Sequence, residues 1–133
     1  MINPKRIGPQ ALPTILVVEG DTALREAIGF SLAAEGYEVR LFRSGEELLA
    51  ADCLEDAACF VVNHRLAKMS GLGVIEAIAQ LGLPGRCILT TTRPTPHMRE
   101  VCGRLGVPIM EKPLLGQSLS ACIRGLLARP AAS

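Results

Sequence analysis

The sequence predicts an α/β fold, a doubly wound five-stranded parallel sheet with helices on both faces. Two observations support this prediction. Short apolar runs alternate along the chain with longer segments whose apolar residues recur at helical spacing. The runs Ile15–Val18 and Cys59–Val62 are continuously apolar, as expected of central strands that are covered on both faces. Strands and helices that alternate in this way assemble into a parallel sheet through right-handed crossovers.

Length and composition favour one domain of ordinary size. The chain has 133 residues, of which 49% are apolar and only 3% aromatic, so Leu, Ile, Val, Ala and Met must build the core. We expect a domain at residues 14–128, a flexible leader at 1–13 and a frayed tail at 129–133. A net charge of +1 argues against nucleic acid as a partner, and no apolar run is long enough to span a membrane. Without a secretory segment, the expected location is the cytoplasm.

The five cysteines are predicted to be free thiols in a reducing compartment, several of them in the core. None belongs to a C-x-x-C pair, and their number is odd. The two histidines, His64 and His97, are not spaced with cysteines as zinc ligands would be.

The first helix follows directly after the first strand. Asp21 or Thr22 is expected to cap its N-terminus, and Gly36 lies where a left-handed C-terminal cap is expected. The next segment, Tyr37–Phe42, alternates apolar and polar residues, which is typical of a half-exposed edge strand. The buried stripe of the first helix should comprise Leu24, Ala27, Ile28 and Leu32.

Two further helices flank the third strand. Ser44 should cap a short helix that ends at Leu49. The helix after the strand is expected to end near Gly82 and Pro84. Its buried face should comprise Val74, Ile78 and Leu81.

The last third of the chain should hold two strands and two helices. Cys87–Thr91 is the expected fourth strand, and Val107–Met110 is a short fifth strand that follows Gly106. The helix between these strands should bury Met98, Val101, Cys102 and Leu105. The last helix should point Leu119, Ile123 and Leu126 inward.

The stretch Ala58–Gly73 carries the most information about function. Its apolar strand breaks into the polar residues Asn63, His64 and Arg65, and a turn follows before the next helix begins. In open α/β sheets, ligands and chemistry collect beyond the carboxyl ends of the strands. Asn63 therefore stands where an active residue is expected, and its side chain is an amide.

This stretch resembles the response-regulator receiver domain, the CheY-like family of two-component signalling. Members usually read V-x-D-x-x-[LM]-P-x-[ML]-[SD]-G here, and the Asp accepts a phosphoryl group from a histidine kinase. The frame is present as Val61-Val62-Asn63-His64-Arg65-Leu66 followed by Met69-Ser70-Gly71, with Asn63 at the acceptor and Ala67 at the usual Pro. The resemblance covers about residues 14–127 and implies a flavodoxin-like (βα)5 sheet of order 2-1-3-4-5.

The same resemblance assigns the rest of the pocket. The acidic pair after the first strand corresponds to Glu19 and Gly20, and the hydroxyl at the end of the fourth strand corresponds to Thr91. The family Lys and the commonly cis Pro after it correspond to Lys112-Pro113. The aromatic switch position corresponds to Ile109, which is not aromatic.

These substitutions predict a pocket that has lost phosphotransfer. An amide cannot form the acyl phosphate, and Gly20 offers no side-chain ligand, so we expect weak or absent Mg²⁺ binding and no other cofactor. Glu19 and Lys112 should form a simple ion pair. Asp21 either caps the first helix or turns inward as a substitute ligand, and Arg65 either lies over the pocket or is solvated.

The leading hypothesis is a stand-alone pseudo-receiver that acts by protein–protein interaction and is not an enzyme. The implied partner is a histidine kinase, a phosphotransfer protein, another regulator or a second copy of the chain. Receivers usually signal through the face formed by the fourth helix, fifth strand and fifth helix. Here that face offers Arg99, Glu100, Arg104, Ser118 and Arg124.

Two alternatives remain open. The chain could be a phosphorylation-competent regulator if Asn63 deamidates to Asp or another residue accepts the phosphoryl group. His64 is disfavoured as that acceptor, because adjacent strand residues point to opposite faces. The chain could also be a flavodoxin-like binder of a nucleotide or flavin, although it lacks the phosphate-binding loop and the aromatic residues that would stack on a ring.

Overall fold

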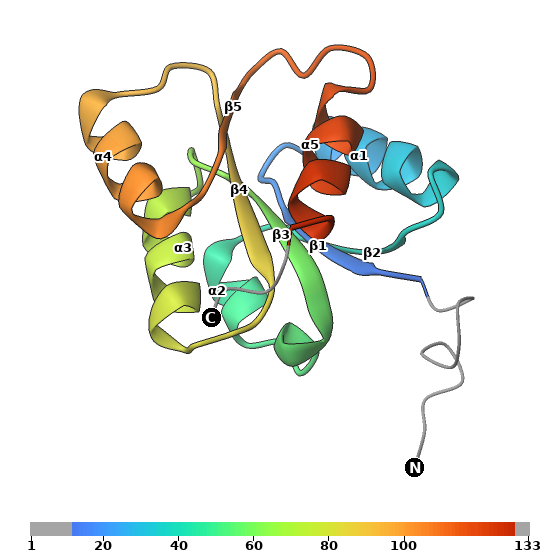
Figure 1. Cartoon of the computed structure of the whole chain (residues 1–133), viewed down its shortest axis with the longest axis horizontal. Helices are drawn as coiled ribbons and strands as arrows, with labels where there is room; N and C mark the ends of the chain where they lie inside the picture. Colours follow the sequence, from blue (N-terminus) through green and yellow to red (C-terminus); the bar gives the residue numbers. More distant parts are fainter. Residues whose placement is uncertain (1–11, 130–133) are drawn as a thin grey trace.

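A computed structural model describes residues 12–129, and their five strands form one parallel sheet of order β2-β1-β3-β4-β5 (Figure 1). Both the fold class and the strand order are therefore confirmed. A short 3₁₀ helix at Leu54–Asp56 precedes β3. The strands are β1 (Thr14–Val18), β2 (Glu38–Phe42), β3 (Ala57–Asn63), β4 (Arg86–Thr91) and β5 (Ile109–Glu111). The helices are α1 (Thr22–Ala34), α2 (Gly45–Leu49), α3 (Gly71–Gln80), α4 (Pro96–Leu105) and α5 (Ser118–Leu127).

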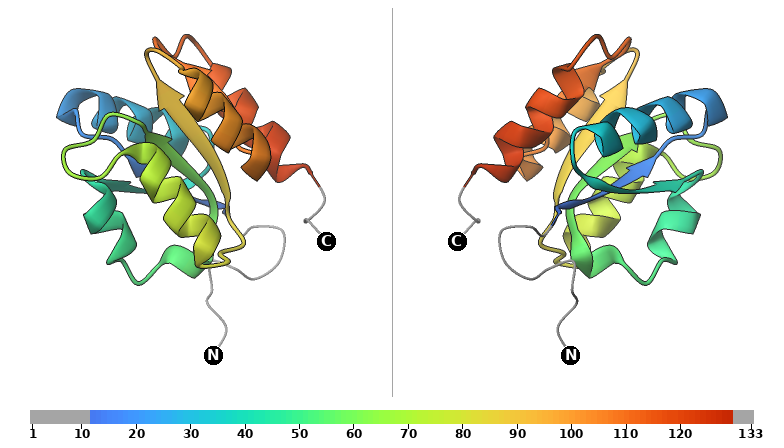
Figure 2. Two further views of the ribbon diagram at one scale, coloured as in Figure 1. Left: turned by 90° about the vertical axis from the view of Figure 1, so that its left-hand side faces the viewer. Right: turned by 90° about the vertical axis from the view of Figure 1, so that its right-hand side faces the viewer.

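The helices cover the sheet in two layers. Helices α1 and α5 lie on one face, and α2, α3 and α4 lie on the other (Figure 2). Alternate residues of β1 point into opposite layers, so Ile15 packs with Ile28 and Ile123 while Leu16 packs with Phe60 on the other side. The uninterrupted apolar sequence of the central strands is thus explained by burial on both faces.

Four of the helices begin at a residue whose side chain caps the first turn. Asp21, Ser44, Ser70 and Thr95 each accept a hydrogen bond from the backbone N–H three residues later, at 2.9 to 3.1 Å. Gly36, directly after the α1 C-cap residue, has a φ of 99°, as its expected role as a left-handed cap requires.

Four details of the predicted elements are wrong. Leu105, expected in the buried stripe of the fourth helix, is 37% exposed because it is the last residue of α4. Ala27 is exposed, and the neighbouring Arg25 is buried instead, because its guanidinium reaches backbone carbonyls that satisfy it. Leu81 is 59% exposed because α3 ends one residue before it. The fifth strand begins at Ile109 rather than Val107, since the Val107 N–H still donates to Cys102 at the end of α4.

The described residues contain no disulfide, and all five cysteines are free. Cys59, Cys87 and Cys102 are buried in the core, as expected for structural thiols. Burial raises the pKa of Cys59 and of Cys87 to about 12. In the described part of the chain, no helix has both the length and the apolar character needed to cross a bilayer. Residues 1–11 of the expected leader and 130–133 of the expected tail lie outside the described residues.

Gly71 closes the loop that leads from β3 into α3. Its N–H donates to the His64 carbonyl at 2.8 Å, and its Cα lies against the backbone of Asn63. A side chain at this position would overlap the Asn63 carbonyl and come within 2.7 Å of the His64 Cα. The loop can therefore close only around a glycine.

We expect Gly71→Ala to lower the free energy of unfolding by about 1–3 kcal/mol, because the rigid backbone must move to admit the methyl group. Gly103→Ala is the matched control, since a methyl group in that part of α4 meets nothing within 4 Å. The control should instead stabilise the helix by roughly 0.5–1 kcal/mol. Urea unfolding of both variants measures the difference, and equal stabilities would contradict the close approach at Gly71.

Candidate functional site

The predicted site residues meet in a pocket of about 320 Å³ beyond the carboxyl ends of β1, β3 and β4. It lies where the strand order reverses between β1 and β3, the place where open α/β sheets bind ligands. The residues that line it are Glu19, Gly20, Asp21, Leu24, Asn63, Arg65, Thr91, Thr92 and Lys112.

Asn63 is bonded at both ends of its amide. Its Nδ2 donates to the Arg65 carbonyl at 2.8 Å, and its Oδ1 accepts from the Thr90 hydroxyl at 3.4 Å. The carbonyl of Arg65 can only accept, so this contact requires the nitrogen of an amide and excludes a carboxylate oxygen. Only 6% of Asn63 is exposed. The amide thus ties the loop after β3 to the end of the sheet.

Glu19 and Lys112 form the expected ion pair, with Lys112 Nζ 2.9 Å from Glu19 Oε1. The second oxygen of Glu19 accepts from the Asp21 N–H at 3.0 Å. The side chains are only 4% and 15% exposed, respectively, so each charge depends on the other. The peptide bond between Lys112 and Pro113 is cis, as the resemblance implied.

The donors of the pocket do not suit Mg²⁺, which prefers several free oxygen ligands. Glu19 is already paired with Lys112, and Gly20 has no side chain. Asp21 is exposed, and its carboxylate accepts from the Leu24 N–H at 2.9 Å, which makes it the helix cap. Among the described residues, no group of three or more His, Cys, Asp or Glu is placed to hold a metal ion.

Arg25 is a pocket neighbour that the sequence reasoning missed. Its guanidinium donates to the Glu19 carbonyl at 2.8 Å and to the Thr22 hydroxyl at 3.3 Å. Together with the Gly20 carbonyl at 3.4 Å, these acceptors are all uncharged oxygens. Its position in the sequence could have indicated this role, since Arg25 immediately follows the capped first turn of α1 and is close in sequence to the pocket residues. It adds a fixed positive charge behind the loop that carries Glu19 and Gly20.

A second pocket of about 430 Å³ adjoins the first at Arg65, Thr91 and Thr92. It is also lined by His64, Arg93 and Met98. His64 therefore lies in a different pocket from Asn63, as the alternation along the strand predicted. Local sequence patterns did not identify Thr92 and Arg93 as pocket residues, because their approach to the β3 loop depends on the pairing of β3 with β4.

His64 is held in place by its backbone but not by its ring. Its N–H donates to Thr90 at 2.8 Å and its carbonyl accepts from Gly71. The ring Nδ1 is buried without a hydrogen-bond partner. Burial lowers the pKa of His64 below its ordinary value of 6.5.

The surface residues proposed for a partner divide between two places. Arg99, Glu100 and Arg104 are exposed on α4, and Ser118 is exposed at the start of α5. The side chain of Arg124 extends toward α1, because its guanidinium lies 3.2 Å from Glu35 Oε1 at the end of that helix. Its role on a partner surface stays a prediction. Ile109 is half-buried and packs against the core.

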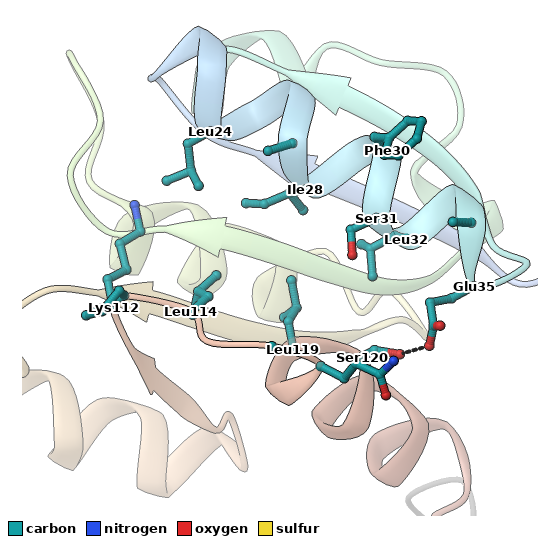
Figure 3. Close-up of a pocket in the computed structure, with 15 residues that line it drawn as sticks. Leu24, Ile28, Phe30, Ser31, Leu32, Glu35, Lys112, Leu114, Leu119 and Ser120 are labelled. Atoms are coloured by element: carbon teal, nitrogen blue, oxygen red, sulfur yellow. Dashed lines mark hydrogen bonds between the residues drawn. The ribbon is translucent and has the colours of Figure 1, made fainter.

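The α1–α5 side also holds a larger cavity, about 640 Å³ (Figure 3). Its wall is mainly apolar, with Leu24, Ile28 and Leu119 pointing into it, and Ser120 closes one end by bonding to Glu35. Lys112 lies at the other end, between this cavity and the Asn63 pocket. The cavity shares Leu24 and Lys112 with the Asn63 pocket and is also lined by Pro113, but Glu19, Asn63 and Thr91 do not line it.

Residues 15–124 match the response regulator receiver domain. The chain belongs to this family. Receivers are signalling modules that interact with kinases or other proteins. The family match favours such a module over the flavin or nucleotide binder that the sequence left open.

Relatives of this receiver include two regulatory proteins. The tetrathionate response regulatory protein TtrR of Salmonella typhimurium is 29% identical over 117 residues, which are 87% of this chain and 57% of TtrR. The transcriptional regulatory protein FixJ of Azorhizobium caulinodans is 28% identical over 124 residues, which are 92% of this chain and 58% of FixJ. The chain thus spans little more than half the length of these relatives.

Solved receivers share the fold. The non-phosphorylated HemR receiver domain of Leptospira biflexa gives a TM-score of 0.83 at 20% identity, covering 91% of this chain and 98% of that one. A CheY-like receiver of Methanospirillum hungatei gives 0.79 at 25% identity, covering 87% and 94%.

Removal of one partner of the Glu19–Lys112 pair should lower the stability of the folded chain strongly. We expect Lys112→Met to lower the free energy of unfolding by about 3–5 kcal/mol, because it leaves a buried carboxylate uncompensated. Adding Glu19→Gln should recover most of that loss. Arg43→Gln, which breaks an exposed pair with Glu47, is the control and should cost about 0–1 kcal/mol. A Lys112→Met variant no less stable than the control would contradict the pairing.

The stability of this receiver should fall as His64 becomes protonated. The unfolded chain takes up this proton near pH 6.5, whereas the folded chain does so at lower pH, since burial lowers the pKa. Stability is therefore full above 6.5 and is lost as pH falls through the window below it. Urea unfolding at several pH values should show a smaller acid loss in His64→Gln than in the parent. Equal losses would show that His64 titrates normally.

Proposed function

We propose that this receiver is a protein-binding module that signals without aspartyl phosphorylation. The observation that carries the proposal is the bonding of Asn63, whose nitrogen is committed to the Arg65 carbonyl at 2.8 Å. A carboxylate at that place would set an acceptor against an acceptor and bury a charge. The phospho-acceptor position has thus taken on a structural role that an Asp would disrupt. The same contact argues against the alternative in which Asn63 deamidates and becomes the acceptor.

The proposal includes weak or absent Mg²⁺ binding and no other cofactor. Phosphorylation of an Asp in an active receiver needs a cation to offset charge on the phosphoryl oxygens. Here the carboxylate of Glu19 is neutralised by Lys112, and the carboxylate of Asp21 caps α1. The remaining charge is insufficient to hold a divalent ion, so the pocket keeps its shape without metal and catalyses no phosphoryl transfer or hydrolysis.

The partner, in this proposal, is a histidine kinase, a phosphotransfer protein, another regulator or a second copy of the chain, met in the cytoplasm. The α4–β5–α5 face offers Arg99, Glu100, Arg104 and Ser118, all exposed, as contact residues. Their mixed charges favour a protein surface that is itself charged, since such contacts select partners mainly through complementarity. Arg124 is left out because it is paired with Glu35.

The proposal is tested with acetyl phosphate and Mg²⁺ on the unmodified chain, followed by intact mass and amide chemical shifts. We expect no phosphoryl adduct, and no shift on adding Mg²⁺ with beryllofluoride, because neither the nucleophile nor the cation ligands are present. Asn63→Asp alone should restore little phosphorylation, since Gly20 still offers no ligand to Mg²⁺. A strongly phosphorylated parent or single variant would overturn the proposal.

Gly20→Asp combined with Asn63→Asp is the positive control. Gly20 tolerates a side chain, because a methyl group there meets nothing closer than the Arg43 carbonyl at 4.0 Å. The combined variant adds two carboxylates beside Glu19 and should regain Mg²⁺-dependent shifts. It shows that the assay detects a restored site on this scaffold.

A further inference from the structure

Helices α1 and α5 lie on the same face of the sheet, and the cavity of about 640 Å³ remains between them (Figure 3). Among residues 12–129, the hydrogen bonds that join the two helices are all made by Glu35, which bonds to Ser120 and to Arg124. The helices are thus fastened together where α1 ends, and the cavity extends from there to Lys112. Sites that bind small molecules usually have volumes of about 300–1,000 Å³, so this cavity has the size of such a site.

The wall of this cavity is mainly apolar on both helices. Leu24 and Ile28 of α1 point into it, and so does Leu119 of α5 (Figure 3). Phe30 also lines the cavity and is 80% exposed, so its ring lies at the rim in contact with water. Transfer of apolar surface out of water is favourable, so an apolar occupant would be stabilised by these side chains and by the ring at the rim.

The charged side chains of the cavity are already paired. Among the described residues that line it, only Lys112 and Glu35 carry a charge. Lys112 lies 2.9 Å from Glu19, and Glu35 lies 3.2 Å from Arg124. A charged occupant would have to compete with one of these pairs or lose its water without a counter-charge, which costs free energy. The distribution of charge therefore favours a neutral occupant.

Two neutral polar side chains are available to orient such an occupant. Ser31 lies on α1 and Gln117 directly precedes α5, and both line the cavity. The hydroxyl of Ser31 points toward α5 (Figure 3). Within the described part of the chain, neither side chain is hydrogen-bonded to another protein group, whereas Ser120 is bonded to Glu35. A hydroxyl and an amide can each donate and accept, so either can bond to a polar group of a ligand.

We propose that the α1–α5 cavity binds a small neutral molecule with an apolar body and one hydroxyl, carbonyl or amide group. The apolar body lies between Ile28 and Leu119, and the polar group bonds to Ser31 or Gln117. Because Ile28 and Leu119 are only 7% and 8% exposed, an occupant must enter between the helices to reach them, which a small molecule does more readily than the surface of a second protein. Asn63 does not line this cavity, so the inference goes beyond the proposed function and holds whether or not the acceptor position is phosphorylated.

The test uses N-phenyl-1-naphthylamine, a neutral apolar probe with a single N–H group, whose fluorescence rises in apolar surroundings. With the unmodified chain we expect a saturable rise, and amide NMR shifts centred on Ile28, Ser31 and Leu119. The 8-sulfonate derivative of the same probe is the matched anion. It should bind about tenfold more weakly, because its charge finds no free counter-charge in the cavity. Equal or tighter binding of the sulfonate would overturn the assignment to a neutral ligand.

Substitutions on α1 locate the binding site. Ala27 is exposed and lines the cavity, so Ala27→Phe should fill part of it and weaken binding of the neutral probe about tenfold. Ala23→Phe is the matched control, because Ala23 is equally exposed one turn earlier on α1 but does not line the cavity. Ala34→Phe, with Ala33→Phe as its control, repeats the comparison near the other end of the helix. Equal affinities of a cavity variant and its control would overturn the site.

Sedimentation at the same protein concentrations tests whether a second copy covers the cavity instead. A monomeric parent that binds the neutral probe saturably supports the proposal. A dimeric parent that becomes monomeric in Ala27→Phe and on addition of the probe would show that a second copy is the occupant, and would overturn it. Fluorescence that never saturates would mean unspecific adsorption and would also overturn the site. The substituted alanines are exposed, so the variants should fold, and the amide spectrum checks that directly.

Discussion

The ion pair between Glu19 and Lys112 is the interaction on which the rest of the site depends. It joins the end of β1 to the segment after β5, residues that are 93 positions apart in the chain. Both side chains are largely removed from water, so neither charge is stable without the other. Because the two charges balance each other, the pair adds no net charge to the pocket. Gly20 and Asn63 add none either, so Glu19 has its counter-charge in Lys112.

Asn63 places a neutral amide in the same pocket as this ion pair. In a receiver that is phosphorylated, the side chain at this position must be a nucleophile that approaches phosphorus. Here the amide is hydrogen-bonded to two protein groups, the Arg65 carbonyl and the Thr90 hydroxyl. In the proposed function, the amide that replaces the nucleophile also stabilises the loop. The arginines and His64 beside it then leave the end of the sheet with a positive character that an acidic, metal-binding pocket would not have.

The cavity between α1 and α5 adjoins this site at Leu24 and Lys112, but most of its wall is apolar. Its apolar walls are the outer parts of the same side chains that seal α1 and α5 onto the sheet. The polar contact of Glu35 with Ser120 and Arg124 holds the two helices together at one end. That contact directs Arg124 away from α4, and so separates the face available to a partner from the seam between α1 and α5.

The sequence by itself determined the strands and the helix caps, because these depend on local patterns, whereas the residues of the acceptor pocket came from the resemblance to receivers. Continuous apolar runs identify buried strands, and Asp21 and Ser44 identify helix starts through bonds three residues away. The resemblance to receivers supplied the strand order, which then brought Glu19 and Lys112 together. Only the tertiary structure decided three features. They are the hydrogen bonds of Arg25, the pairing of Arg124 with Glu35, and the arrangement of His64, Arg65 and Arg93 around one pocket. Those outcomes depend on which loops become neighbours when strands pair and on whether a long side chain reaches a distant partner, and neither is encoded in local spacing.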